Sequence, residues 1–133
     1  MLGDAPVYAV LPCVDLEGAR KFYGEVLGLK QVDLPGASAE EAAGNALFQC
    51  GEGTRLLVYQ RPTPTRADHT AAGWLVEDVE AVVDALMAHG VRMEVYDMPD
   101  VEFDEKGIAR FGNRSGAWFK DPEGNILAIN QMP

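Results

Sequence analysis

The stretch AWFKDPEGNILAI, residues 117–129, decides the fold of this chain. Two apolar runs, rich in aromatic and β-branched residues, flank the polar segment DPEGN at residues 121–125. Pro122 fixes its own φ and Gly124 tolerates a positive φ, so the polar segment predicts a tight turn. We therefore expect residues 117–129 to form a β-hairpin.

The same hairpin pattern occurs earlier in the chain, as ALFQCGEGTRLLVYQ at residues 46–60. Six residues are identical at a constant offset of 71: Ala46/Ala117, Phe48/Phe119, Glu52/Glu123, Gly53/Gly124, Leu56/Leu127 and Gln60/Gln131. A fixed offset with matching turn residues indicates an internal repeat.

The elements before each hairpin are repeated as well. Asp15 and Asp78 each precede apolar residues at helical spacing, and Gly28 and Gly90 end those segments. In the first half we expect a strand at 7–13, a helix at 16–27, a strand at 29–34 and a short helical turn at 39–43. In the second half we expect a strand at 70–76, a helix at 79–89 and a strand at 91–96.

The repeat predicts the domain organisation. Residues 62–68 contain two prolines and no apolar periodicity, so we expect them to link a module at 1–61 to a module at 69–133 within one domain. Each module is predicted to contain a strand, a helix and three further strands, in the order βαβββ. This order gives an α+β fold with one helix on one face of a four-stranded sheet. Side by side, two such sheets can curl into a half-open barrel whose concave surface suits a small molecule.

The second module is longer than the first, because the offset grows from 62 or 63 at the helices to 71 at the hairpins. The extra residues lie within 97–114, an acidic segment. We expect a solvated loop there, within which residues 108–111 can form an extra strand, and which can cover one end of the cup as a lid.

Composition excludes several kinds of partner. The formal net charge of −10 argues against binding to nucleic acid or to an anionic membrane surface, since both need clustered Lys and Arg. No apolar run approaches the ~20 residues of a membrane span, and no signal peptide is recognisable. We expect a cytoplasmic protein in which Cys13 and Cys50 are reduced, buried thiols.

The chain resembles the vicinal-oxygen-chelate superfamily, which includes glyoxalase I, extradiol dioxygenases, fosfomycin-resistance enzymes and bleomycin-resistance proteins. The segments that carry the resemblance are Val14–Leu16, Phe22–Tyr23, Leu27–Leu29, Val76–Val79 and Phe119–Asn125. Together with the duplicated βαβββ order they cover nearly the whole chain and are specific for the fold. They do not specify a reaction, because one fold carries many chemistries.

In metal-dependent members of that superfamily, the ligands project from the first and last strands of each module. The resemblance places these positions at Tyr8, Leu57, Ala71 and Ala128, paired by the repeat offsets of 63 and 71. A divalent transition metal prefers imidazole or carboxylate ligands, which none of these residues supplies. We therefore expect neither a metal nor another cofactor.

Two groups of polar and aromatic residues are candidates for the site. His69 is two residues before Ala71 and would share its face on a continuous strand, so a register shift of two would make it a ligand. The alternative is an ordinary His at the start of a strand. Aromatic residues and an Arg could form a stacking pocket for a planar ligand, or the aromatics could simply fill the core. The predicted cup-lining set is Tyr8, Arg55, Leu57, Tyr59, His69, Ala71, Trp118 and Ala128.

These observations favour a metal-free protein, similar to bleomycin-resistance proteins, that binds a small, partly aromatic molecule. The resemblance also implies a homodimer with pockets between subunits, and we assign no catalytic residue. One alternative is a metal-dependent lyase or dioxygenase that uses His69. Another is a dimerising module whose cup is filled by its own side chains.

Overall fold

The structure is a computed structural model that describes all 133 residues. The chain divides into two compact units. Unit 1 comprises residues 1–66 and 122–124, and unit 2 comprises residues 67–121 and 125–133. The division falls inside the segment 62–68 that we predicted to be a linker. None of the helices combines the length and apolar character needed to cross a membrane.

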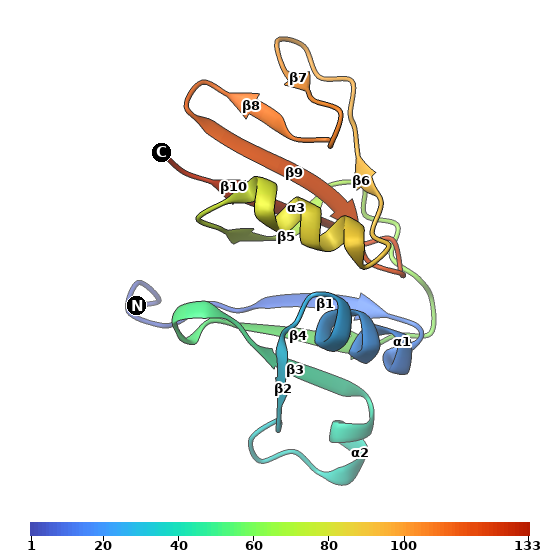
Figure 1. Ribbon diagram of the computed structural model, residues 1–133. Coiled ribbons are helices and arrows are strands. Elements are labelled where there is room, and N and C mark those ends of the chain that lie inside the picture. The colour runs from blue at the N-terminus through green and yellow to red at the C-terminus, as the bar shows by residue number, and fades with distance from the viewer. The chain divides into compact units, whose positions relative to one another are not determined.

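Unit 1 contains a four-stranded sheet in the order β1-β4-β3-β2, with β1 parallel to β4 and the other pairs antiparallel. The strands are β1 (Ala9–Cys13), β2 (Lys30–Val32), β3 (Asn45–Gln49) and β4 (Arg55–Gln60). The helical segments are α1 (Leu16–Lys21), a π-helical turn (Phe22–Val26), α2 (Ala39–Ala43) and a 3₁₀ turn (Gly51–Gly53). Figure 1 shows α1 lying on one face of this sheet. Both cysteines are free thiols, but only Cys13 is buried, and Cys50 is half-buried.

The predicted first helix changes geometry half-way along. Asp15 caps α1 as expected, yet the N–H of Leu27 donates to the carbonyl of Phe22 at 2.9 Å, five residues back. This is π-helical hydrogen bonding, which widens the turn. The segment buries both Phe22 and Tyr23, whose rings meet edge to face with centroids 5.3 Å apart.

Unit 2 contains a six-stranded sheet in the order β5-β10-β9-β8-β7, with β6 also paired to β9. The strands are β5 (Thr70–Leu75), β6 (Met93–Glu94), β7 (Glu102–Phe103), β8 (Ala109–Phe111), β9 (Arg114–Lys120) and β10 (Ile126–Gln131). The helix α3 (Val79–Ala88) is capped by Asp78 and buries Val79, Val83 and Leu86. It packs on β9 and β10, as Figure 1 shows. Mixed sheets with few helices confirm the predicted α+β class.

The acidic segment 97–114 corrects one prediction. Part of it is not loop: residues 102–103 and 109–111 form the hairpin β7–β8, which extends the sheet beyond β9 (Figure 1). The extra strand expected at 108–111 is confirmed as β8 (Ala109–Phe111), and Ile108 and Ala109 are fully buried. The hairpin forms because these two apolar residues interrupt the acidic run and bury on the sheet. The strand expected at 91–96 shortens to Met93–Glu94.

A buried polar pair closes the hairpin between β9 and β10. Asp121 Oδ1 accepts from the backbone N–H of Asn125 at 2.9 Å, and its Oδ2 accepts from the Asn125 side-chain amide at 2.7 Å. The backbone N–H of Asp121 also donates to the carbonyl of Asn125 at 3.0 Å. Gly124 supplies a φ of +92° inside the turn. These bonds satisfy a buried carboxylate and hold the two strands in a single register.

The turn Pro122–Gly124 clusters with unit 1 and gives Glu123 a structural role. The Glu123 carboxylate accepts from the backbone N–H groups of Val14 at 2.8 Å and Asp15 at 3.0 Å, immediately before α1. The equivalent Glu52 in the first hairpin is exposed and has a φ of 56°. The two hairpins therefore share their turn pattern but differ in what the Glu side chain binds.

We expect Glu123→Gln to lower the free energy of unfolding by about 0.5–1 kcal/mol, since it removes the charge and one of two acceptors at the start of a helix. Urea unfolding followed by circular dichroism measures the change. The matched control is Glu52→Gln, which should change stability by less than about 0.5 kcal/mol. Equal effects of the two substitutions would contradict the role of Glu123.

Candidate functional site

One face of the unit 2 sheet is covered by α3 and the opposite face carries Trp118. Side chains alternate along each strand, so Phe119 and Leu127, both fully buried, lie on the α3 side. Across three neighbouring strands of the opposite face, Trp118 on β9 pairs with Ala128 on β10, which pairs with Gly73 on β5. On the β10 and β5 side Trp118 therefore has only small neighbours, Ala128 and Gly73, whereas on β6 it pairs with Glu94.

The indole of Trp118 lies across the sheet. Its Nε1 donates a hydrogen bond of 3.1 Å to Thr70 Oγ1 on β5, and β10 lies between β9 and β5. The ring must therefore pass over Ala128, which is only 4% exposed although no helix covers that face. Because the indole N–H is already bonded, Trp118 presents its π face rather than a donor to any ligand.

Three further aromatic rings surround Trp118. Tyr96, Phe103 and Phe111 have centroids 5.8, 5.9 and 6.1 Å from it, with interplanar angles of 82°, 48° and 82°. Tyr96 follows β6, and the two phenylalanines come from the inserted hairpin. Sequence reasoning missed all three as site residues. For the two phenylalanines the available signal was the presence of aromatic side chains within an acidic insertion, where a solvated loop would not need them.

Trp118 borders two hollows. The larger, about 370 Å³, is lined by Leu75, Phe111, Arg114, Trp118, Asn130, Gln131 and Met132. The smaller, about 270 Å³, is lined by Asp68, His69, Thr70, Tyr96, Met98, Trp118 and Ile126. Volumes near 300 Å³ correspond to the smallest ligand sites, which bind molecules of one or two rings.

The hydroxyl of Tyr96 is buried beside the smaller hollow and has no hydrogen-bond partner. Burial, reinforced by the negative charge of Glu94, raises the pKa of Tyr96, so the group stays a neutral phenol at neutral pH. A buried hydroxyl without a partner costs roughly 1–3 kcal/mol. A ligand that hydrogen-bonds to this hydroxyl would recover part of that cost.

His69 lies at the edge of the smaller hollow. Its Nδ1 is 3.1 Å from the carbonyl oxygen of Thr70; since a carbonyl only accepts, Nδ1 is the donor of this hydrogen bond. We predicted that His69 and Ala71 share one face of a continuous strand, and this prediction is wrong. β5 begins at Thr70, and a bulge between Thr70 and Ala72 interrupts the alternation at Ala71.

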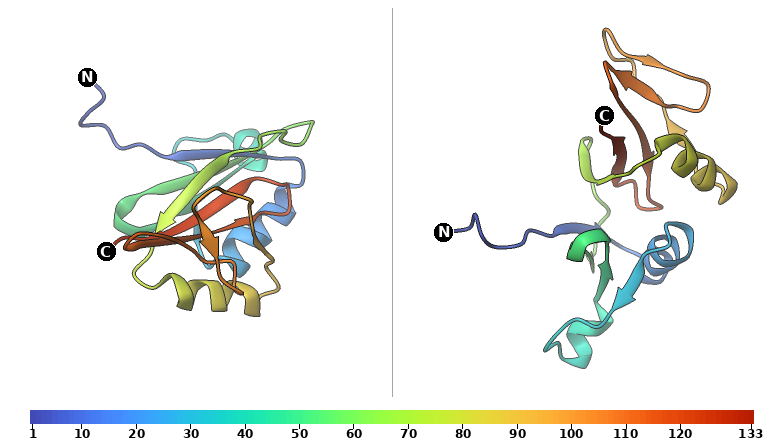
Figure 2. Two further views of the ribbon diagram at one scale, coloured as in Figure 1. Left: turned by 90° about the horizontal axis from the view of Figure 1, so that it is seen from above. Right: turned by 60° about the vertical axis from the view of Figure 1, so that its left-hand side comes forward.

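The other predicted site residues belong to unit 1. Figure 2 shows the N-terminal segment running out from β1. Tyr8 directly precedes β1 and is 56% exposed. Leu57 pairs with Val10 and is half-buried, and Arg55 is exposed. Tyr59 is half-buried under the Arg61 guanidinium, whose central carbon is 5.9 Å from the ring centroid.

The predicted set is thus divided between the two units. Tyr8, Arg55, Leu57 and Tyr59 are in unit 1. Within unit 2 the structure brings Trp118, Ala128 and His69 together around the two hollows.

Residues 6–129 match the profile of the Glyoxalase/Bleomycin resistance protein/Dioxygenase superfamily. The chain belongs to this superfamily. The predicted resemblance is therefore confirmed over nearly the whole length.

Solved structures of the superfamily share the fold. A protein assigned to the glyoxalase family from Bacillus anthracis has a TM-score of 0.77 at 17% identity, covering 98% of this chain and 96% of the other. A lactoylglutathione lyase from Agrobacterium tumefaciens has a TM-score of 0.68 at 22% identity, covering 98% and 96%. A fosfomycin resistance protein from Listeria monocytogenes has a TM-score of 0.68 at 11% identity, covering 98% and 94%. Identities this low show a common fold and leave the ligand open.

From the resemblance we predicted metal-ligand positions at Tyr8, Leu57, Ala71 and Ala128. Leu57 and Ala128 lie on strands β4 and β10, and Ala71 lies at the bulge of β5. All three are aliphatic and offer no donor atom, and Ala128 lies beneath the Trp118 indole. No three His, Cys, Asp or Glu side chains form a group that could hold a metal ion. These residues do not fit a divalent transition metal at the superfamily's positions.

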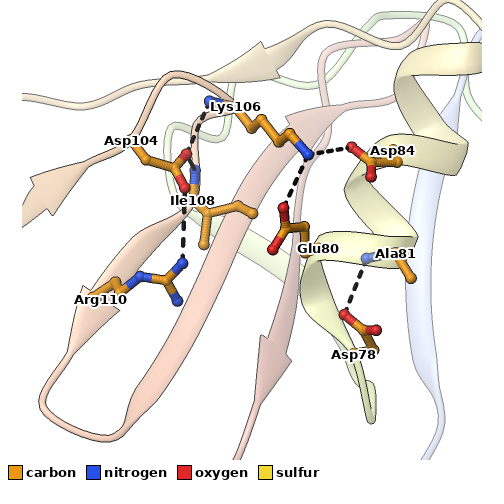
Figure 3. A network of polar contacts seen from close by, with 8 residues as sticks. All are labelled: Asp78, Glu80, Ala81, Asp84, Asp104, Lys106, Ile108 and Arg110. Carbon is orange, nitrogen blue, oxygen red and sulfur yellow. Dashed lines mark hydrogen bonds and ion pairs between the residues drawn. The ribbon is translucent and has the colours of Figure 1, made fainter.

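A polar network connects the inserted hairpin to α3 (Figure 3). Lys106 Nζ lies 2.9 Å from Asp84 Oδ1 and 3.0 Å from Glu80 Oε1, which are one helical turn apart. Hydrogen bonds to Asp84 and Glu80 raise the pKa of Lys106, so its ammonium stays charged. Asp104 Oδ1 accepts from the backbone N–H groups of Lys106 and Ile108, both at 2.9 Å, and shapes the turn. The network holds in place the hairpin that carries Phe103 and Phe111.

We expect Lys106→Gln to loosen this hairpin, because a neutral amide cannot replace two ion pairs. Amide hydrogen exchange across residues 102–111 should become several-fold faster, with no change in β3 and β4. Lys30→Gln, which removes the same charge from β2, should leave the hairpin unchanged. Unaltered exchange in the Lys106 variant would show that the network does not restrain the hairpin.

Proposed function

We propose that this protein is a metal-free member of its superfamily that binds a small, partly aromatic molecule. The observation that carries the proposal is Trp118, a half-buried indole fixed by Thr70 and bordered by two hollows. The ligand would lie on the unit 2 sheet face that α3 leaves uncovered.

The aromatic surroundings favour a ring-bearing ligand. Aromatic pairs prefer offset or edge-to-face contact, and each such pair contributes about 0.5–1.5 kcal/mol beyond the burial of its area. Tyr96 and Phe111 both meet Trp118 nearly edge to face, which orients the indole before a ligand arrives. A preorganised ring loses little side-chain entropy on binding.

The chemistry of the site supports binding more than catalysis. The aliphatic residues at the superfamily's ligand positions supply no metal donor, and His69 is the single imidazole at the hollows. The protein would therefore bind its ligand without reaction and form a homodimer, like the sequestering proteins of the superfamily. Native mass spectrometry of the purified protein measures the number of copies.

Tryptophan fluorescence tests the proposal, because the chain has two tryptophans on opposite faces of the unit 2 sheet. Trp118 pairs with Ala128, and Trp74 pairs with Ile129 on the α3 side. In Trp74→Phe the emission comes from Trp118 alone. We expect at least one compound from a panel of one- and two-ring aromatics to quench or shift it saturably.

The matched control is Trp118→Phe, which keeps an aromatic ring and leaves Trp74 as the reporter. We expect no saturable change in Trp74 emission with the same compounds. The affinity measured by calorimetry should be at least about tenfold weaker, because the smaller ring offers less area for stacking and burial. A panel that leaves Trp118 emission unchanged at millimolar concentrations would refute the proposal.

Elemental analysis separates this function from a metal-dependent lyase or dioxygenase that uses His69. We expect less than about 0.1 transition-metal ion per chain after purification without a metal-affinity tag, since one imidazole is a weak site. Ligand binding should survive treatment with a chelator. One bound metal ion per chain that is lost in His69→Ala would refute the metal-free binding protein and support the metal-dependent enzyme.

A further inference from the structure

We infer that the ligand of the larger hollow is an aromatic carboxylate, which rests on the proposed function and specifies its chemical class. The hollow has an apolar side formed by Phe111, Trp118 and Leu75. It has a polar side formed by Arg114 and Asn130. A molecule with a planar ring at one end and a negative charge at the other matches both sides.

Arg114 is the only charged residue that lines this hollow, in a chain with a net charge of −10. Its exposed side chain has no carboxylate partner in the structure. By contrast, the other cations of this unit's sheet face acidic groups: Arg110 lies 3.9 Å from Asp104, and Lys120 lies 3.5 Å from Glu94. An unpaired guanidinium beside an aromatic wall is suited to a carboxylate, which its planar fork binds with two hydrogen bonds.

Asn130 adds a second polar group at the same end of the hollow. It pairs with Gly116, and a Cβ built on Gly116 would lie 2.7 Å from Asn130 Oδ1. The missing side chain thus leaves room for the Asn130 amide above β9, between Arg114 and Trp118 along the strand. The amide makes no hydrogen bond within the protein. Its N–H₂ can donate to a ligand oxygen.

Charge and size select the carboxylate among organic anions. A single guanidinium balances one negative charge, which fits a carboxylate better than a doubly charged phosphate monoester. A volume of about 370 Å³ admits one or two fused rings. The smaller hollow is less suitable, because Asp68 lines it and would repel an anion.

The test compares 2-naphthoate with its neutral isostere 2-naphthamide by calorimetry on the native chain. We expect the carboxylate to bind about tenfold more tightly, a moderate gain because salt and water screen an exposed Arg. In Arg114→Gln this preference should disappear. In Arg110→Gln, which removes the same charge from the opposite face of the sheet, the preference should remain.

Each other result overturns the inference. Equal affinities for acid and amide, with a normal Trp118 response, would refute the carboxylate and leave the aromatic-binding function standing. Tighter binding of 2-naphthyl phosphate than of 2-naphthoate would replace the carboxylate with a phosphate ester. If no naphthyl probe binds while other aromatics quench Trp118, the inference fails on its own; if no aromatic acts on Trp118, the proposed function fails with it.

Discussion

The hydrogen bonds between Asp121 and Asn125 are the constraint on which the candidate site depends. They close the β9–β10 turn with one register, and that register places Trp118 opposite Ala128. A slip of one residue would turn Trp118 toward α3 and bring Phe119 to the open face. A buried carboxylate with its hydrogen bonds satisfied inside the turn makes such a slip costly.

The site arises from an asymmetry between two halves that share one pattern. Unit 1 keeps four strands, whereas unit 2 adds the hairpin β7–β8 beside β9. That hairpin brings Phe103 and Phe111 against Trp118 and is held to α3 through Lys106. Insertion into one copy of a duplicated module has thus produced an aromatic cluster without disturbing the repeated core. The pattern shared by the two halves accounts for the core, while the hairpin present only in unit 2 builds the aromatic cluster.

Small residues are as important here as large ones. Ala128 pairs with Trp118, and its methyl group leaves space for the indole to cross β10 to Thr70. Gly116 similarly leaves space for the Asn130 amide. A larger side chain at residue 128, such as His or Glu, would compete with Trp118 for the same volume.

The sequence by itself determined the local elements and the repeat. Asp15 and Asp78 marked the helix starts, the offsets of 63 and 71 paired the modules, and the turn DPEGN placed the last hairpin, because caps, turns and periodicity act over a few residues. Only the tertiary structure decided that the acidic insertion forms strands, that β5 carries a bulge, and that Tyr96 and Phe111 meet Trp118. Those features depend on contacts between residues distant in the chain, whose burial offsets local preferences that favour a loop.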